Sequence, residues 1–431
     1  MKIGGAPLMR ISSAKVILSL VFIFFGSVIA FSYQNEYKFK DYAPISFRNN
    51  SSDWHNRNDH LIPNEVEAYA VLSLDQERDF SGKDIDYDGV PNQLDPSPYD
   101  WREAGYQPFG VLEFLSWRHP WNNYKYDEKS LIKLVKLMKE AGVGFVRMDF
   151  LWEDIEPARG SFDFKKYDYI VNLLYNENIR ILAILDYTAS WTGAKWNNPP
   201  PRTQDFVNFL SEVVKRYKDK IKYWEIWNEP NSTTYWDPQD EMVGYTNLLK
   251  ACYIRAKQID ASSKIVLGGM TSEGYYSIKN VYKNGGKDYF DVINMHPFVN
   301  PLVSGDIKRV NSIYNNLVKL KAEYGDEDKS IWFTEIGCPG VKKIKESKGW
   351  WNGKSPNEKE QAQFLHSIYT DVIKLPDVDK VFWAFFRDNK DHFKNDVDYF
   401  GLVRWDFSKK PGFGAYKDRY NNWKKHYKAS Y

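Results

Sequence analysis

The sequence predicts an α/β protein built as a (β/α)8 TIM barrel with a short N-terminal extension, and three observations carry that prediction. Eight short apolar or β-branched runs follow one another from Phe109 to Phe386. Amphipathic stretches of helical period separate these runs, as in parallel strands joined by helices. No glycine-rich phosphate loop follows any of the runs, which disfavours the alternative, an open doubly wound sheet.

The composition is that of an ordinary globular protein with many aromatic residues. The 431 residues include 59 Lys and Arg against 57 Asp and Glu, a formal net charge of +2. This balance argues against a nucleic-acid-binding protein, which usually shows a basic excess. The 26 Phe, 30 Tyr and 16 Trp are expected to pack a core or to line a cleft that stacks sugar rings. We expect Cys252 and Cys338 to be free thiols.

The first element, residues 1–32, is predicted to be a signal peptide or a membrane anchor. Residues 1–15 contain three basic residues and no acidic one, and an uncharged run follows from Val16 to Phe31. Secretory signals have this arrangement, whereas a membrane-spanning helix needs about 20 apolar residues. Either alternative predicts a secreted or cell-envelope, extracytoplasmic protein that meets a membrane only through this segment.

The second element, residues 33–100, is predicted to be a polar extension with a calcium-type loop at 84–95. Oxygen-bearing groups recur there at the alternate positions that wind a loop around a calcium ion. The expected ligands of this structural Ca²⁺ are Asp84, Asp86, Asp88, the carbonyl of Val90, Asn92 and Asp95. The loop resembles a single thrombospondin type 3 repeat. The alternative is a solvated acidic turn.

The third element, residues 101–431, is predicted to be one catalytic barrel domain. Its strands are expected at 109–115, 144–150, 179–187, 221–227, 264–270, 291–297, 330–336 and 380–386. Their near-continuous apolar composition is typical of parallel strands buried on both faces. Helices are expected at 129–141, 163–177, 203–220, 241–259, 275–284, 306–324, 357–375 and 413–426.

Acidic residues close two of these strands. The fourth strand ends in Asn228-Glu229-Pro230 and the seventh in Glu335-Ile336-Gly337, and barrel enzymes carry their active sites at these strand ends. Two facing carboxyl groups are the minimal equipment for hydrolysing a glycosidic bond, because one protonates the leaving oxygen and the other attacks or activates water. No zinc-binding cluster and no GxSxG motif occurs, so no cofactor is expected for catalysis.

These strand-end motifs resemble those of clan A glycoside hydrolases, closest to family 39 or the neighbouring family 5. The resemblance extends from Phe109 to the last helix. It implies a retaining double displacement in which Glu229 is the acid/base and Glu335 is the nucleophile that forms a covalent glycosyl intermediate. It also implies that Asn228 holds the 2-hydroxyl of the reacting sugar. Strict strand alternation would put Asn228 and Glu229 on opposite faces, so the strand is expected to break or bulge there.

Other strand residues are expected to support the pair. Arg147 resembles the clan's barrel arginine and is expected to keep the pKa of Glu335 low, while burial raises that of Glu229; the alternative is a structural ion pair with Asp149. His296 closes the sixth strand as a site residue. The resemblance implies a hydroxyl two residues later, but Phe298 stands there.

Tryptophans near the strand ends are candidate sugar-stacking residues. Trp383 resembles the tryptophan under the reacting sugar, and Trp152 and Trp191 lie just beyond strand ends. Further candidates are Tyr187, Trp236, Trp350 and Trp351. For each of them the alternative is packing.

The expected partner is therefore a polysaccharide or oligosaccharide, with no nucleic acid. The alternative function is a non-catalytic carbohydrate-binding protein on the same scaffold, and the retention of both carboxylates argues against it.

Overall fold

The computed structural model describes residues 107–117, 127–303, 306–347, 353–390 and 392–429. The predicted leader, the calcium-type loop with Asp84, Asp86, Asp88, Val90, Asn92 and Asp95, and the pair Trp350 and Trp351 lie outside the described residues. Among the described helices, none combines the length and the apolar composition needed to cross a membrane.

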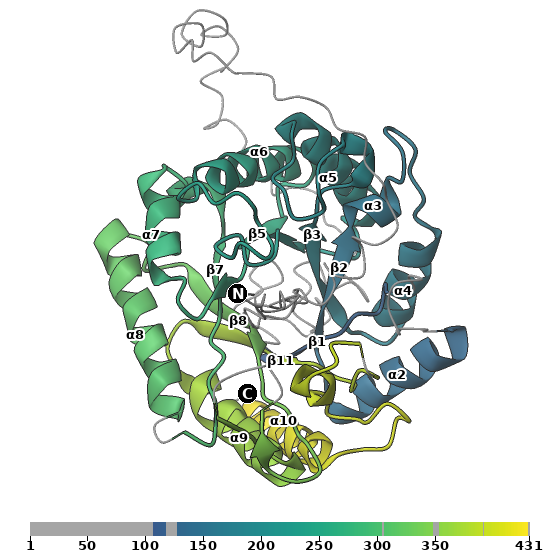
Figure 1. Ribbon diagram of the computed structural model, residues 1–431, viewed down its shortest axis with the longest axis vertical. Helices are drawn as coiled ribbons and strands as arrows, with labels where there is room; N and C mark the ends of the chain where they lie inside the picture. The colour runs from purple at the N-terminus through teal and green to yellow at the C-terminus, as the bar shows by residue number, and fades with distance from the viewer. Residues whose placement is uncertain (1–106, 118–126, 304–305, 348–352, 391, 430–431) are drawn as a thin grey trace, which may run out of the picture.

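The strands form a closed parallel barrel, which confirms the predicted fold (Figure 1). Their order is β5-β4-β3-β2-β1-β11-β8-β7-β6, and an additional β5–β7 pairing closes the ring. The barrel strands are β1 (Phe109–Leu112), β2 (Phe145–Leu151), β3 (Arg180–Asp186), β4 (Tyr223–Ile226), β5 (Lys264–Leu267), β6 (Met270–Thr271), β7 (Val292–His296), β8 (Ser330–Ile336) and β11 (Val378–Ala384). Both β5 and β6 pair with β7, so together they fill one position of the barrel.

Helices surround this barrel, and the first and last of them lie side by side (Figure 1). They are α2 (Glu128–Ala141), α3 (Trp152–Ile155), α4 (Lys165–Asn176), α5 (Thr203–Tyr217), α6 (Val243–Ile259), α7 (Tyr275–Lys283), α8 (Asp306–Tyr324), α9 (Glu358–Asp371) and α10 (Pro411–Ala429). A short antiparallel pair, β9 (Lys345–Glu346) and β10 (Lys354–Ser355), lies outside the barrel.

Local sequence signals explain where several helices begin and end. The Asp127 side chain accepts a hydrogen bond from Ser130 N and caps α2, and Gly142 ends that helix in the left-handed conformation. Asn357 and Glu360 form a capping box at the start of α9. Such caps satisfy backbone groups that have no partner within the helix.

Side chains of the barrel interior lie in layers. The lower layer is apolar and consists of Phe145, Leu182, Tyr223, Val266, Val292, Trp332 and Phe382. Because strand side chains alternate with a period of two, the next inward residues are found two positions further along each strand. On four strands these residues are polar: Arg147, Glu225, Asn294 and Thr334. The polar layer therefore stands on a packed aromatic floor at the C-terminal ends of the strands.

Candidate active site

The chain leaves β4 through a sharp break in strand geometry. Trp227 and Glu229 have left-handed backbone angles, with φ of 68° and 41°, which non-glycine residues rarely adopt. The Trp227 amide still bonds to Leu185 O, and the Glu229 amide bonds to Gly269 O. The break brings Asn228 and Glu229 to the same site, as expected from their sequence position.

An extra residue in β8 has the same effect on the opposite side of the barrel. The pairing with β11 changes register between Phe333, opposite Val381, and Ile336, opposite Trp383. This bulge lets the consecutive residues Thr334 and Glu335 both contact polar groups of the barrel interior. Bulges commonly redirect side chains beside active sites in this way.

The two predicted catalytic carboxyl groups meet beside His296. One oxygen of Glu229, one oxygen of Glu335 and a ring nitrogen of His296 all lie within 4.8 Å of one another. His296 Nδ1 is 2.9 Å from Glu229 Oε1 and 3.8 Å from Glu335 Oε1. These three groups are also a set of metal donors, but a guanidinium already contacts Glu335, which opposes a second cation there.

Arg147 supplies that guanidinium and joins three side chains of the site. It donates to Glu335 Oε1 at 2.5 Å, to the two oxygens of Glu225 at 2.7 and 2.8 Å, and to Asn228 Oδ1 at 2.9 Å. The alternative partner, Asp149, instead accepts from Trp117 Nε1 at 2.8 Å. The predicted association of Arg147 with Glu335 is thus present in the structure.

Burial dominates the electrostatics of the site. It raises the pKa of Glu229 well above its usual value, and the neighbouring charge of Glu335 adds to this effect. Burial also raises the pKa of Glu335 to about 7, although the Arg147 charge opposes the rise. The expectation that Arg147 holds the pKa of Glu335 low is therefore wrong, because desolvation outweighs the attraction. Burial lowers the pKa of His296 well below its usual value, so the imidazole is neutral.

Three of the tryptophans predicted to contact sugar are buried and pack against other side chains. Trp383 is fully buried, packs against Phe364 of α9 and donates to Phe400 O. It points away from the barrel interior because its neighbour Phe382 points inward. Trp152 is also fully buried and stacks on Phe209 of α5. The rim candidate Trp236 likewise packs on Trp227.

Aromatic rings form a wall beside Asn228, in which Tyr187 and Trp196 are half-buried and Tyr235 is buried. The Tyr187 hydroxyl accepts from Asn228 Nδ2 at 3.3 Å, and its ring stacks on Tyr235. Trp196 meets both tyrosine rings edge-on. Burial, followed by the charges of Glu229 and Glu335, raises the pKa of Tyr235, so this phenol lies near the pair.

The predicted rim residue Trp191 contacts Arg159, which forms an ion pair with Asp205. It is half-buried and donates through Nε1 to Glu156 O, and the Arg159 guanidinium lies 4.9 Å from its ring centre. Of the predicted binding tryptophans that the structure describes, Trp191 is the one that keeps partial exposure.

Sequence reasoning missed several polar residues of the site. Glu225, Asn294 and Thr334 lie at inward positions of β4, β7 and β8, two residues beyond the apolar floor. Asp186 ends β3 with both oxygens buried and without a hydrogen-bond partner among the described residues. A polar residue inside an otherwise apolar strand was the available signal for all four.

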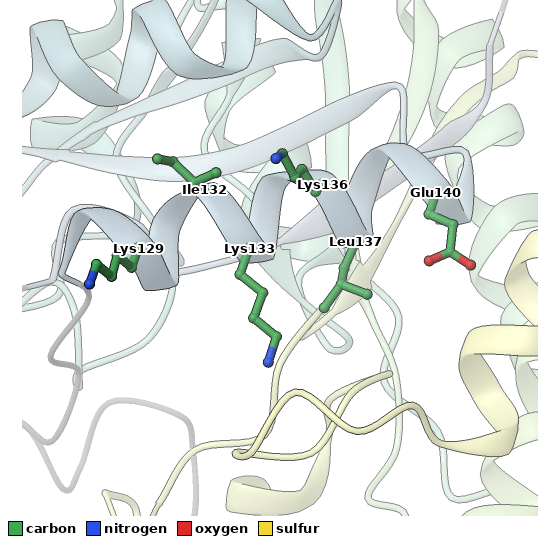
Figure 2. Close-up of a pocket in the computed structure, with 6 residues that line it drawn as sticks. All are labelled: Lys129, Ile132, Lys133, Lys136, Leu137 and Glu140. Carbon is green, nitrogen blue, oxygen red and sulfur yellow. The ribbon is translucent and has the colours of Figure 1, made fainter.

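A hollow on the outside of the barrel carries no such chemistry. Figure 2 shows it over α2, lined by Lys129, Ile132, Lys133, Lys136, Leu137 and Glu140. The single acid, Glu140, is ion-paired with Lys409 and Lys417. None of the predicted catalytic side chains reaches this hollow.

Comparison with known proteins supports the same chemistry. A family model described as cellulase (glycosyl hydrolase family 5) matches residues 103–384. A structure of a family 39 glycoside hydrolase from the gut symbiont Bacteroides cellulosilyticus WH2 has a TM-score of 0.59 and 26% identity, covering 72% of this chain and 63% of that chain.

Two further relatives extend this picture. A monomeric β-xylosidase of Caulobacter crescentus shares the fold, with a TM-score of 0.55 and 15% identity over 72% of this chain and 67% of its own. The β-galactosidase BgaB of a Geobacillus species is 33% identical in an alignment over 146 residues that covers 28% of this chain. That match spans 22% of the length of the curated relative.

Proposed function

The chain belongs to the cellulase family, glycosyl hydrolase family 5, and from that membership we propose that it is a retaining glycosidase of polysaccharides or oligosaccharides. Membership makes it a glycoside hydrolase. The retaining mechanism and the residue roles rest on the site. The observation that carries them is the convergence of Glu229, His296 and Glu335 within 4.8 Å.

The separation of the carboxyl groups favours retention. Retaining enzymes hold the two groups about 5–5.5 Å apart, whereas inverting enzymes need about 6.5–9.5 Å to admit a water molecule. Oxygens of Glu229 and Glu335 lie within 4.8 Å of each other. This spacing leaves room for the anomeric carbon and no room for a water between that carbon and Glu335.

The proposed roles follow from the different surroundings of the two acids. Glu335, oriented by Arg147, attacks the anomeric carbon while Glu229 gives its proton to the departing oxygen. This step breaks the glycosidic bond and forms a glycosyl ester on Glu335. Glu229, now a carboxylate, takes a proton from the water that attacks the anomeric carbon of the ester. This step releases Glu335 as a carboxylate and leaves Glu229 protonated again. Asn228, held by Arg147, is proposed to bind the 2-hydroxyl.

The substrate is proposed to be a glycoside in β linkage. Relatives include proteins described as a β-xylosidase and a β-galactosidase, so a β-linked glycoside is the natural first class to test. The half-buried rings of Tyr187 and Trp196 offer apolar surface to a further sugar unit beside Asn228. Export through residues 1–32 and calcium in the loop 84–95 remain part of the proposal.

The test is a panel of glycans with product length and anomeric configuration read by NMR. The parent should release a product that first retains the anomeric configuration of the substrate. Glu335→Gln and Glu229→Gln should each lower kcat by at least about 1,000-fold. Glu212→Gln, on the exposed face of α5, serves as the control and should behave like the parent.

Two outcomes would contradict the proposal. An inverted first product would exclude the covalent intermediate on Glu335. Glycan binding without release of any product by the parent would favour the non-catalytic carbohydrate-binding alternative.

A further inference from the structure

A continuous chain of buried hydrogen bonds leads from Glu225 to the acid/base. Asn294 Nδ2 is 3.0 Å from Glu225 Oε1, and Thr334 Oγ1 is 2.8 Å from Asn294 Oδ1. His296 Nε2 is 3.0 Å from Thr334 Oγ1, and His296 Nδ1 is 2.9 Å from Glu229 Oε1. The other four members of this chain are fully buried, so no solvent competes for these bonds. They are Glu225, Asn294, Thr334 and His296.

The direction of the chain is determined at its Glu225 end. Glu225 accepts two hydrogen bonds from Arg147 and one from the backbone amide of Gly269. With these donors around it, Glu225 Oε1 acts as an acceptor. The group that Asn294 presents to it must therefore be the NH₂ group, and its carbonyl oxygen must face Thr334.

The proton positions follow one after another. Asn294 Oδ1 only accepts, so the single hydroxyl proton of Thr334 must point toward it. Thr334 Oγ1 then offers a lone pair to the imidazole, and His296 must carry its proton on Nε2. In a neutral ring this leaves Nδ1 without a proton.

The bare Nδ1 faces Glu229 Oε1 at hydrogen-bond distance. Two acceptors cannot share a hydrogen bond, so the proton between them must come from the carboxyl group. The charged groups that surround His296 are Arg147 from β2, Glu335 from β8 and Glu229 itself. Burial, followed by the charge of Arg147, lowers the pKa of His296 and keeps the ring neutral beside Glu335.

We propose that Thr334 is a positioning residue that sets the tautomer of His296 and thereby stores the proton of the acid/base on Glu229 Oε1. The proposal rests on the acid/base role proposed for Glu229. The second carboxyl oxygen, Oε2, is buried without a partner among the described residues, so the carboxyl group can turn to the substrate. After that proton leaves, the lone pairs of Glu229 Oε1 and His296 Nδ1 face each other. Their repulsion favours the transfer of a proton from water to Glu229 in the second step.

The decisive variants are Thr334→Val, which keeps the shape and removes the hydroxyl, and Thr334→Ser, which keeps the hydroxyl. In Thr334→Val the ring proton loses its acceptor and is expected on Nδ1, where it stabilises ionised Glu229. The basic limb of the kcat/KM pH profile should then move down by about one pH unit. Thr334→Ser should keep the parental limb.

The tautomer itself is measured by ¹⁵N NMR of histidine-labelled protein, with the His296→Gln variant used to assign the signal. The parent and Thr334→Ser should show the Nε2–H tautomer, and Thr334→Val should show the Nδ1–H tautomer. This readout on the parent stands even if Thr334→Val does not fold.

Three results would overturn the proposal. They are an Nδ1–H ring or an imidazolium in the parent at its active pH, the same tautomer in Thr334→Val, or an unchanged basic limb with a uniform loss of kcat. Failure of the acid/base assignment is distinguishable, because full activity of Glu229→Gln would refute it while the NMR result still reports the tautomer.

Discussion

At the scale of single residues, two glutamates with the same side chain differ in pKa because their surroundings differ. Glu229 contacts a neutral imidazole and Glu335 contacts a guanidinium. Burial raises the pKa of both, but a cation opposes the rise most directly at Glu335. Such divergence between paired acids is how acid and nucleophile roles are divided.

This divergence predicts a neutral to alkaline optimum. Glu335 must be ionised to attack, so kcat/KM should rise as the pH passes its pKa of about 7. Glu229 must be protonated, so activity should fall only at the higher pH where it ionises. The pH dependence of kcat/KM, measured with a soluble glycan, gives an acidic and a basic apparent pKa. Both values belong to the coupled pair of carboxyl groups. An acid limb below pH 5 would mean that Arg147 outweighs burial.

Asp186 provides a residue-level prediction about stability. Burial, followed by the charge of Asp149, raises its pKa above the usual 3.8. The folded state therefore binds the Asp186 proton more tightly than the unfolded state, and stability falls as the pH rises through this window. Asp186→Asn removes the group whose ionisation is opposed by folding, and should stabilise the fold by about 1–3 kcal/mol at pH 8, with a smaller effect near pH 4.

Urea denaturation at the two pH values measures this effect. Asp219→Asn, at a largely exposed side chain, is the control and should change little at either pH. A destabilised Asp186→Asn at pH 8 would show that the carboxylate makes a favourable interaction in the folded protein.

The residue scale also shows which site members were readable from the sequence. The predicted site residues either end a strand or place a charge inside one, and the structure brings these side chains together. They are Glu229, Glu335, Arg147, Asn228 and His296. Trp383 was misplaced because a tryptophan in an apolar strand suits either face. Its direction depends on the inward position of Phe382, which only the assembled barrel defines.

At the scale of elements, the interruption between β5 and β6 shapes the site. Gly268 and Gly269 separate the two strands, and Gly269 bonds to both Glu225 and Glu229 through its backbone. A Cβ atom on Gly269 would lie 2.0 Å from His296 Nε2. Only the absence of a side chain lets the imidazole occupy its place.

Gly269→Ala should therefore displace His296 and lower kcat by about 100-fold, with a modest change in Tm, since small displacements of catalytic groups have effects of this size. Steady-state kinetics and thermal unfolding separate the two effects. Gly414→Ala, in α10 where an added Cβ meets nothing within 4 Å, is the matched control. Parental kcat in Gly269→Ala would show that His296 does not need its observed position.

The element boundaries were largely predictable because long amphipathic and apolar runs determine them. The predicted and observed ranges coincide for α8 and for β8. The irregular parts were not predictable in detail, since the left-handed turn at Trp227 and the bulge in β8 depend on pairing with neighbouring strands.

At the scale of the whole molecule, the barrel could be predicted because eight strand and helix units repeat one local pattern. The order in which strands meet follows from the closure of that repeat. The convergence of side chains from β2, β4, β7 and β8 could not be measured from sequence, since it depends on the relative register of four strands.

The N-terminal extension supplies a prediction for the complete chain. If residues 84–95 bind calcium, a chelator should lower the Tm, and added Ca²⁺ should restore it, because a ligand that binds only the folded state stabilises it. Differential scanning calorimetry measures the shift. Asp88→Ala should show a lowered Tm that the chelator does not lower further. An unchanged Tm together with no calcium in the purified protein would contradict the prediction.

The pairing of β1 with β11 has a consequence for aggregation. Because Phe109 lies opposite Val381, the barrel loses its unpaired strand edges only when its last strand is in place. A chain cut before Val378 would leave β1 and β8 with open rows of backbone donors and acceptors, which are templates for association with other chains. The strand that bears Glu335, β8, would itself be such an edge. The closing strand β11 therefore both completes the catalytic rim and protects the protein from aggregation.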